Sequence, residues 1–354
     1  MKLDAEFYRL PLRFDVERLK AEAEAFGENE WRAHPTGFQG NSALLLISAA
    51  GGDNDALLGP MRTTPMLERS PYIKQVLASM QTVFGRSRLM RLDGGAEVTE
   101  HSDINYHWYS HIRVHVPIVT HPDVRLFCNG KSVHMAPGEC WIFDTWKMHK
   151  VINPTNQARI HLVADTSGSA QFWDMVSRSE RPLESDGGAV AEPRIVAYES
   201  GKDIPVPVET YNAPLVMSPG EVDALVLDII EDLQAADGME PLAVARFCEV
   251  LNHFRWNWRT NWSLHGPTQA GWAGYQALRK QTRQMLAGIS SLLTLASNRS
   301  DAVQVFSDRV LTASLNPHLA PLHQPQISGA RQGDMASHPY PSGFGAHQRK
   351  GGAR

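Results

Sequence analysis

The chain has two regions with different hydrophobic periodicity, and the first of them predicts β-structure. Between residues 87 and 165, short runs rich in Val, Ile, Leu and aromatic residues are separated by turn signals. The turn signals are Gly94-Gly95, His121-Pro122-Asp123, Asn129-Gly130, Pro137-Gly138 and Asn153-Pro154. Several short strands at such regular spacing are typical of a sandwich or barrel and not of parallel βαβ units.

Individual elements can be predicted within this first region and before it. Residues 126–133 form the clearest hairpin, because the central Asn129-Gly130 pair can take the positive φ angles of a type I′ turn. A strand at 140–143 is expected after the next glycine turn. The elements expected nearer the N-terminus are a charged amphipathic stretch at 15–25, a buried strand at 43–48 and a helix at 71–83.

The second region has helical periodicity. It begins with Ser218-Pro219-Gly220-Glu221, a capping box with proline at the first helical position, and apolar residues follow at helical spacing. Further helices are expected at 242–262, 269–296 and 301–315.

These patterns predict four parts of the chain. Residues 1–175 form a β-rich domain, and residues 176–216, rich in Pro, Gly, Ser and charge, form a linker. Residues 217–316 form a helical domain. The tail at 317–354 contains few large apolar residues and is expected to be disordered.

Composition and charge argue against several classes of protein. The net charge is -4 and the sequence pI is about 6.4, so no overall positive field is available to hold nucleic acid. The longest apolar run, at 43–50, is far shorter than the roughly 20 residues that cross a bilayer. Charged residues interrupt positions 1–15, which argues against a signal peptide, and the 3 cysteines form no CxxC pair. We therefore expect a cytoplasmic protein that binds neither nucleic acid nor a membrane.

A cluster of histidines supplies the candidate chemistry. Of the 15 histidines, 8 lie between His101 and His161. On extended backbone, His101 and Asp103 project from the same face, and a third ligand must come from a distant strand. His149, at the end of a turn after a well-marked strand, is the best candidate. Two imidazoles and one carboxylate on one face leave positions open for a cosubstrate and O2, as a non-haem Fe(II) oxygenase requires.

Two Arg-x-His pairs on separate expected strands strengthen this hypothesis. Arg159 shares a strand face with His161, and Arg113 shares a strand face with His115. A guanidinium can clamp a carboxylate with two hydrogen bonds. A barrel lined in this way suits a small dicarboxylate that also chelates a metal.

Several motifs together carry a family resemblance over roughly a quarter of the chain. They are His-x-Asp at 101–103, Arg-x-His-Val-Pro at 113–117, Gly138-Glu139-Cys140-Trp141-Ile142-Phe143-Asp144, a histidine shortly after it, and Arg159-Ile160-His161-Leu162-Val163-Ala164-Asp165. In these motifs the stretch 87–165 resembles the aspartyl/asparaginyl β-hydroxylase family of Fe(II)/2-oxoglutarate-dependent oxygenases.

The resemblance implies an α+β fold with a double-stranded β-helix, or jelly-roll, core and N-terminal helices, followed here by a C-terminal helical domain that lies outside the resemblance. It implies that the His/Asp/His triad binds Fe(II), with 2-oxoglutarate and O2 as cosubstrates. It also implies Arg159 on the distal carboxylate of 2-oxoglutarate, with Arg113 and His115 near the metal-proximal end. By analogy, the expected reaction hydroxylates a C–H bond of an amino acid, free or within a peptide or a natural-product intermediate.

Other interpretations of the same residues stay open. Polar residues flank strands in any sandwich, and Arg159 or the Arg113 and His115 pair can be ordinary buried or ion-paired strand residues. A cupin-like metal enzyme would keep the triad but would release no succinate. A carboxylate-sensing binding module would bind its ligand tightly without iron and show no turnover.

The remaining histidines and aromatic residues have weaker signals. The histidines expected to be surface or hydrogen-bonded groups, not ligands, are His107, His111, His121 and His134. The residues that form either a substrate-contacting lip or ordinary loop packing are Asn105, Tyr106, Trp108 and Tyr109. In the helical region, Phe254, Trp258 and Trp262 recur at helical spacing, which predicts core packing. The expected partner is a small-molecule or peptide substrate, and a protein partner or self-association through the helical domain stays open.

Overall fold

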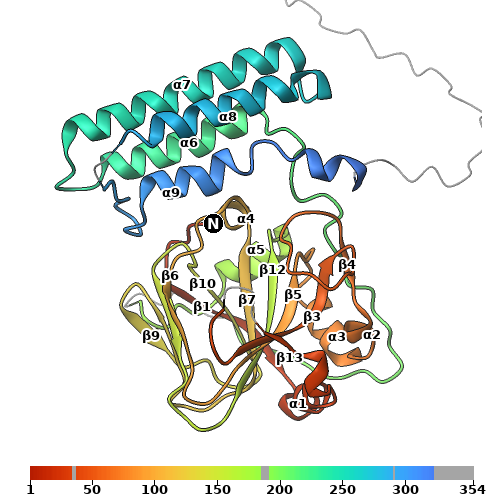
Figure 1. Cartoon of the computed structure of the whole chain (residues 1–354). Coiled ribbons are helices and arrows are strands. Elements are labelled where there is room, and N and C mark those ends of the chain that lie inside the picture. The colour runs from red at the N-terminus through yellow and green to blue at the C-terminus, as the bar shows by residue number, and fades with distance from the viewer. Residues whose placement is uncertain (34–36, 185–190, 290–291, 323–354) are drawn as a thin grey trace, which may run out of the picture.

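The computed structural model describes residues 1–33, 37–184, 191–289 and 292–322, which form a β-rich unit and a helical unit (Figure 1). The helices are α1 (Val16–Glu24), α2 (Pro65–Glu68), α3 (Pro71–Ala78), α4 (Tyr106–Ser110), α5 (Ala170–Ser177), α6 (Pro219–Gln234), α7 (Pro241–His265), α8 (Trp272–Leu286) and α9 (Ala302–Phe306). The strands are β1 (Phe7–Phe14), β2 (Arg32–Ala33), β3 (Asn41–Ala49), β4 (Met61–Thr63), β5 (Ser87–Leu92), β6 (Glu97–His101), β7 (Ile112–Val119), β8 (Arg125–Cys128), β9 (Lys131–Val133), β10 (Glu139–Phe143), β11 (His149–Ile152), β12 (Arg159–Thr166) and β13 (Arg194–Val196). Among the helices of the described residues, none has the length and apolar character needed to span a bilayer.

Two sheets form the β-rich unit. The larger sheet has nine strands in the order β13-β1-β10-β7-β12-β5-β3-β2, with β4 paired to β3, and the smaller has four strands in the order β6-β11-β8-β9. Only the β1–β13 pair is parallel among the strand pairs of the described residues. This arrangement, followed by the helical unit, confirms the predicted jelly-roll fold with a C-terminal helical region.

Alternation along the central strands gives the larger sheet two different faces. On β12, Leu162 and Ala164 pack against α1, α3 and α5 in one hydrophobic core, whereas Arg159, His161 and Val163 point toward the smaller sheet. A second apolar cluster, which includes Trp141 of the larger sheet, lies between the sheets. Polar groups inside the jelly roll are therefore enclosed by two layers of backbone.

Local sequence signals account for several of these elements. The hairpin between β8 and β9 turns at Asn129 and Gly130, whose φ angles are 51° and 77°, as the Asn-Gly pair predicted. The Asp15 side chain caps the N-terminus of α1 by accepting a hydrogen bond from the Arg18 backbone N–H. The Ser218 side chain caps α6 in the same way, through the Glu221 N–H.

The helical unit contains α6 to α9, which Figure 1 shows over the end of the jelly roll where α4 lies. The aromatic stripe of α7 is core, as predicted, because Phe254 and Trp258 are buried and Trp262 packs partly buried beside them. Trp146 of the jelly roll is buried in this same cluster. The two units therefore share a hydrophobic core.

Some predicted boundaries were wrong. The helix expected at 71–83 ends at Ala78, and Gln81 then takes a positive φ of 55° that does not continue a helix. The helix expected at 269–296 covers only Trp272–Leu286, and Gly288 follows its end. The helix expected at 301–315 is split into α9 and one π-helical turn at Ser307–Leu311.

The segment expected to be a linker carries regular structure. Within 176–216, β13 pairs in parallel with β1, and Val208 forms a bridge to Phe84. Composition did not reveal this pairing because these few residues gain their hydrogen bonds from strands far away in the chain. The predicted tail begins with a short 3₁₀ helix at Pro317–Leu322, and its remaining residues lie outside the described ones. The division of the chain into these four parts stays a prediction.

Candidate active site

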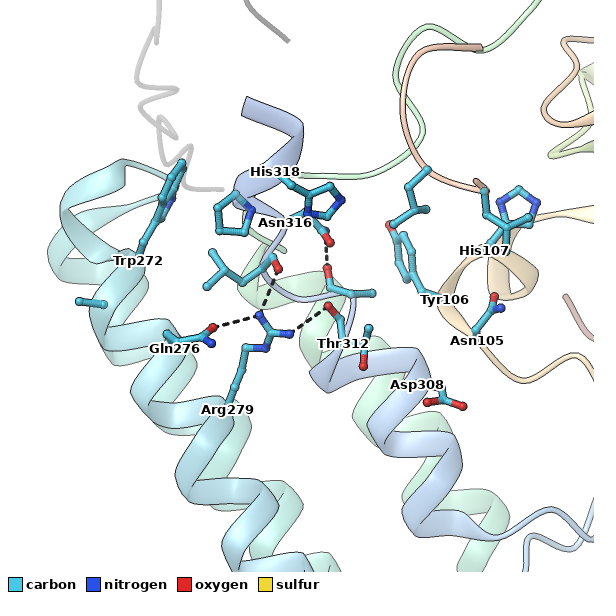
Figure 2. Close-up of a pocket in the computed structure, with 16 residues that line it drawn as sticks. Asn105, Tyr106, His107, Trp272, Gln276, Arg279, Asp308, Thr312, Asn316 and His318 are labelled. Atoms are coloured by element: carbon cyan, nitrogen blue, oxygen red, sulfur yellow. Dashed lines mark hydrogen bonds between the residues drawn. The ribbon is translucent and has the colours of Figure 1, made fainter. Parts of the chain in front are cut away.

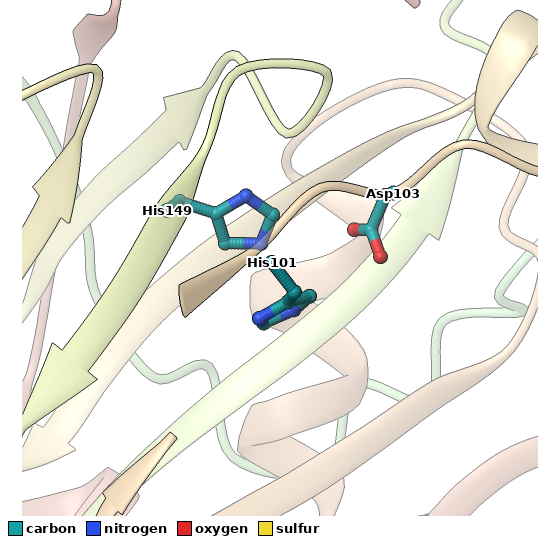
Figure 3. Close-up of side chains that lie close together, drawn as sticks. All are labelled: His101, Asp103 and His149. Atoms are coloured by element: carbon teal, nitrogen blue, oxygen red, sulfur yellow. The ribbon is translucent and has the colours of Figure 1, made fainter. Parts of the chain in front are cut away.

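Strand pairing brings the predicted metal ligands together. His101 is the last residue of β6 and His149 the first of β11, and the two are direct partners across the smaller sheet. Asp103 lies just beyond the end of β6, where its backbone N–H donates to the carbonyl of Thr145, 2.9 Å away. The three side chains point toward one another (Figure 3), and their candidate ligand atoms all lie within 4.8 Å of one another. Within the described residues this is the one such group of three metal-binding side chains.

The orientation of both imidazoles fits a metal ion. His101 Nδ1 lies 2.7 Å from the Thr99 carbonyl, and His149 Nδ1 lies 2.9 Å from the Lys147 carbonyl. A carbonyl can only accept, so each Nδ1 carries the proton and each Nε2 keeps its lone pair. His149 Nε2 and Asp103 Oδ2 are buried and make no hydrogen bond. Buried polar atoms without partners indicate a missing ligand, and one cation would satisfy both of them.

Burial also sets the protonation state of one ligand. It lowers the pKa of His149 to about 4, which leaves the imidazole neutral at neutral pH, although the nearby Asp103 carboxylate opposes the shift. Neutral imidazole is the form that donates an electron pair to a metal. The donor set of two imidazole nitrogens and one carboxylate suits Fe(II) and leaves coordination positions free.

The triad faces a cavity of about 370 Å³ between the two sheets. Its apolar lining from the two sheets includes Val98, Leu126, Phe143, Val151, Val163 and Met90. Its basic lining consists of Arg86, Arg88, Arg113 and Arg159. A small anion bound there would therefore be held among cations and shielded from water.

Arg159, predicted to bind the distal carboxylate of 2-oxoglutarate, lies in this cavity. It is buried, and its terminal nitrogen lies 2.7 Å from His161 Nδ1. Burial lowers the pKa of Arg159 to about 9. Among the described residues, no carboxylate pairs with this guanidinium, and its Nε is buried without a partner. A buried, charged group without a counterion is the feature that a carboxylate ligand would complete.

The other predicted pair, Arg113 and His115, also lines the cavity, on β7, where the register pairs His115 with Val163 and Arg113 with Asp165. Arg113 contacts Asp103 Oδ2 at 3.6 Å and Asp165 Oδ1 at 3.4 Å. His115 is buried with both ring nitrogens unpartnered. Burial, with Arg159 and Arg113 nearby, lowers the pKa of His115 well below its ordinary value, so its neutral ring can donate one hydrogen bond into the cavity.

Sequence reasoning missed part of the basic lining. Arg86 and Arg88 are both buried beside the cavity, and Asp55 lies with them there. Arg86 pairs with Asp165, which sequence reasoning placed in a family motif but gave no role. Arg86 and Arg88 are two positions apart, the same spacing as in the Arg-x-His pairs, and that signal could have revealed them.

The four histidines expected to be outside the triad do not join it. His111 Nε2 lies 2.6 Å from Glu209, His107 lies beside Asp165, and His134 lies near the Val124 carbonyl. His121 is largely exposed and contacts Asp123. The interpretation as hydrogen-bonded or surface histidines agrees with the surroundings of His111, His121 and His134. His107 differs, because it is buried and neither ring nitrogen makes a hydrogen bond among the described residues.

A second cavity, of about 720 Å³, lies between α4 and the helical unit (Figure 2). Asn105, Tyr106 and His107 line it on the jelly-roll side, and Arg279 lies on the opposite side, where it donates to two backbone carbonyls. Trp108 instead faces the metal cavity and stacks on Arg113, 4.2 Å from the ring centre. The residues just after the metal motif thus separate two cavities.

Comparison with known proteins places a family match on the jelly roll. Residues 12–168 match the model of the aspartyl/asparaginyl β-hydroxylase family. The matched segment contains the complete triad and Arg159.

Individual relatives are more distant. A curated relative, L-proline cis-3-hydroxylase 1 from a Streptomyces species, is 23% identical over 249 residues and covers 59% of this chain and 82% of its own. Among solved structures, a Pseudomonas putida prolyl-4-hydroxylase has a TM-score of 0.33 at 12% identity, covering 47% of this chain and 95% of that one. A 2OG-Fe(II) oxygenase family protein from Burkholderia pseudomallei has a TM-score of 0.29 at 13% identity, covering 44% and 80%.

Proposed function

We propose that the protein is an Fe(II)- and 2-oxoglutarate-dependent hydroxylase, and the match of residues 12–168 to the model of the aspartyl/asparaginyl β-hydroxylase family supports this proposal. Enzymes of this kind use Fe(II), 2-oxoglutarate and O2. The substrate is an amino acid, free or within a peptide or natural-product intermediate. The name of the Streptomyces relative, a hydroxylase of L-proline, supports this substrate class.

His101, Asp103 and His149 would hold the iron. When bound, the metal activates O2 and, with 2-oxoglutarate as reductant, supplies the oxidising power that converts a C–H bond into an alcohol. The protein contributes ligands whose Nδ1–H groups are anchored on backbone carbonyls, so both rings are fixed before the metal arrives. The neutral state of His149 means that no proton has to leave its Nε2 at neutral pH.

Arg159 would bind the distal carboxylate of 2-oxoglutarate. The absence of a carboxylate partner for this buried guanidinium, within the described residues, is the single observation that carries the proposal, because a diacid that chelates the metal at one end can neutralise it at the other. His115 would orient the metal-proximal end by donating from its unpartnered ring nitrogen. The apolar side chains of both sheets would exclude water from the reacting atoms.

The finer points are part of the same proposal. The protein acts in the cytoplasm on a small-molecule or peptide substrate, and its helical unit is the surface for any protein partner or self-association. The boundaries at 175, 216 and 316 separate the catalytic domain, the connecting segment and the helical domain.

The proposal is tested by following O2, 2-oxoglutarate and product together. The Fe(II) protein is incubated with 2-oxoglutarate and a panel of free amino acids and short peptides, and succinate and product mass are measured. We expect O2-dependent succinate formation matched by a product that has gained one oxygen atom. Arg159→Gln should raise the KM for 2-oxoglutarate by about 100-fold.

Arg125→Gln is a matched control, because Arg125 lies on β8 and donates to Ser132 outside the cavity. It should leave that KM within about twofold. O2 uptake without succinate would support a cupin-like metal enzyme instead. Tight 2-oxoglutarate binding in the absence of iron, without turnover, would support a binding module.

A further inference from the structure

The cavity holds more positive charge than iron and 2-oxoglutarate can use. Arg159 is matched to the distal carboxylate of 2-oxoglutarate, and Asp103 is matched to the metal. Apart from Asp103, the carboxylates that pair with the three further guanidiniums of Arg86, Arg88 and Arg113 among the described residues are two, those of Asp55 and Asp165. One positive charge is left over beside the buried side chains of Arg86 and Arg88, where an uncompensated charge is costly.

The neighbouring histidine does not change this balance. Burial lowers the pKa of His107 to about 4, so it is neutral at neutral pH and adds no charge. Although burial alone would raise the pKa of Asp165, His107 and the Arg86 and Arg113 guanidiniums hold it below its usual range. Asp165 is therefore ionised, and its single negative charge balances the charge of one guanidinium and not of two.

The surplus lies at the opposite end of the cavity from Arg159. The strand register pairs Leu92 with Arg159 and Arg88 with Val163, which is four residues further along β12. At about 3.3 Å per residue along a strand, the backbone positions of Arg159 and Arg88 are therefore roughly 13 Å apart in the strand direction. A five-carbon diacid bound to Arg159 and to the metal does not reach Arg88.

The arginines at this end have donors available. Arg88 donates to Asp55 at 2.8 Å from one terminal nitrogen, and Arg86 donates to the Asp55 carbonyl at 3.1 Å. Arg86 Nε is buried and faces Asp165 Oδ2 at 3.5 Å, an ion pair too long to be counted as a hydrogen bond. Burial, together with the neighbouring Arg86, lowers the pKa of Arg88 to about 9, so a second anion would relieve a real electrostatic penalty.

We propose that Arg86 and Arg88 form a subsite for a free carboxylate of the substrate, so that the substrate is an amino acid with an ionised carboxylate and not an amide-linked residue. The subsite rests on the proposed hydroxylase function, because it assumes that Arg159 and the metal ligands are occupied by 2-oxoglutarate and iron. Asp55 acts as a positioning residue that holds both guanidiniums at the cavity.

The test compares each of the twenty L-amino acids with its primary amide as stimulators of succinate formation. An amide is nearly the same size as the acid but lacks its charge. For every amino acid that stimulates, the acid should exceed the amide in kcat/KM by at least about 100-fold. Arg88→Gln should lower the acid-to-amide ratio of kcat/KM to about 10 or less, because a neutral side chain does not favour the carboxylate over the amide.

Arg91→Gln is the matched control on the same strand, since Arg91 pairs with exposed Glu28 at the surface. It should leave the acid-to-amide ratio unchanged. An amide as effective as its acid, an unchanged ratio in Arg88→Gln, or no stimulation by any free acid would overturn the subsite. The anaerobic 2-oxoglutarate complex is measured in each variant, and failure of the wild-type protein to form it would overturn the proposed function instead.

A separate set of contacts concerns the helical unit, whose segment 297–309 touches both loops that carry metal ligands. Ser300 Oγ lies 2.7 Å from Ser102 Oγ, between the two ligands His101 and Asp103 in sequence. Arg309 Nε donates to the carbonyl of Ile104, the residue after Asp103, at 3.2 Å.

The same segment holds the loop before His149. Ser297 Oγ accepts a hydrogen bond from Trp146 Nε1 at 2.7 Å, and the Ser297 carbonyl accepts one from Lys147 Nζ at 3.2 Å. The carbonyl of Lys147 is the group that fixes the ring of His149. Arg309 also lies over the Trp146 ring, 4.0 Å from its centre.

The geometry points to a second role for this chain's helical unit: Ser297, Ser300 and Arg309 are positioning residues that hold the metal-ligand loops in register. The contacts join groups distant in sequence, and Arg309 is fully enclosed while it does so. Metal affinity depends on how well its ligands are held before binding, so loosening these loops weakens metal binding without removing a ligand.

Titration of the metal-free protein with Co(II), followed by its visible absorption, tests this role. Arg309→Met and Trp146→Phe should each raise the Kd for Co(II) by about 10-fold. The Trp146→Phe variant keeps an aromatic ring in the core, so it still tests the positioning role if Arg309→Met does not fold.

Arg279→Met is the control, because Arg279 is also a buried arginine of the helical unit, and its hydrogen-bond partners among the described residues all belong to that unit. It should change the Kd by less than twofold. An unchanged Kd in both test variants, or an equal loss in Arg279→Met, would overturn the positioning role.

Discussion

Arg159 in the jelly roll and Arg309 in the helical unit are both buried guanidiniums, but their surroundings differ. Arg309 pairs with Asp228, donates to a backbone carbonyl and packs against two aromatic rings. Arg159 contacts the ring of His161 and, within the described residues, no carboxylate. A satisfied buried charge is part of the architecture, whereas an unsatisfied one indicates where a ligand binds.

The same contrast holds for histidines. In the jelly roll, His107, His115 and His161 are buried with pKa values lowered by burial. In the described part of the helical unit, His253 and His265 are exposed. The histidines inside the jelly roll are therefore kept neutral, a form that can bind a ligand, at a cost in the free energy of unfolding.

The largest expected effect comes from removing a metal ligand. His149→Ala should lower succinate formation by more than about 1000-fold, because two remaining ligands do not hold Fe(II) against water. Bound iron should fall from about one per chain to near zero, as measured by elemental analysis. His134→Ala, which lies outside the triad, should retain both iron and activity. If His149→Ala kept its full iron content, His149 would not be a metal ligand.

Acid should distinguish the two units. The pKa of His107 is about 4 in the folded protein and about 6.5 unfolded, so between these values the unfolded chain binds the additional proton. The contribution of His107 to the free energy of unfolding is therefore complete above pH 6.5. It falls by about 3 kcal/mol as the pH is lowered from 6.5 to 4. Hydrogen exchange should show the jelly roll opening before α6 and α7. Earlier exchange in the helices would contradict the contrast.

Replacing the two arginines by methionine should change stability in opposite directions. Arg159→Met removes a buried charge without a counterion and should raise the free energy of unfolding of the metal-free protein by about 2 kcal/mol. Arg309→Met removes the donor to the Ile104 carbonyl and one of the two cations paired with Asp228, which keeps Lys2, and should lower it by about 2 kcal/mol. Urea denaturation measures both. Two losses of similar size would mean that Arg159 is a structural residue.

The smallest expected effect lies in the helical unit away from the ligand loops. Ser218→Ala removes the cap of α6 and should lower the free energy of unfolding by about 1 kcal/mol. The Kd for 2-oxoglutarate should stay within about twofold, since the first turn of α6 reaches the jelly roll through Glu221 and Tyr106 of α4 and not through a metal ligand. A larger change in that Kd would show that stability and ligand binding are not separable in this way.

The sequence was informative where one strand carries the signal. His101 and Asp103 share a short motif, and the spacing of Arg159 and His161 shows that both lie on one strand face. The role of His149 was reachable because a turn and a strand precede it. The hairpin at Asn129 followed from backbone conformation alone.

The rest depended on contacts between distant segments. The spacing of Arg86 and Arg88 shows that they share a strand face, but nothing local shows that this face lines the cavity between the two sheets. The contact between Ser300 and Ser102, in the loop that carries the metal ligands, joins residues almost 200 positions apart, and hydrophobic periodicity cannot predict such a contact. For the same reason β13 was read as linker.

The central claim is that the triad and Arg159 together bind 2-oxoglutarate on iron. Anaerobic titration of the Fe(II) protein with 2-oxoglutarate tests it most directly, by the metal-to-ligand charge-transfer band. We expect a band that saturates at one equivalent per chain and that requires about 100-fold more 2-oxoglutarate in Arg159→Gln. An iron-loaded protein that develops no band, or equal titrations for wild type and Arg159→Gln, would contradict the account.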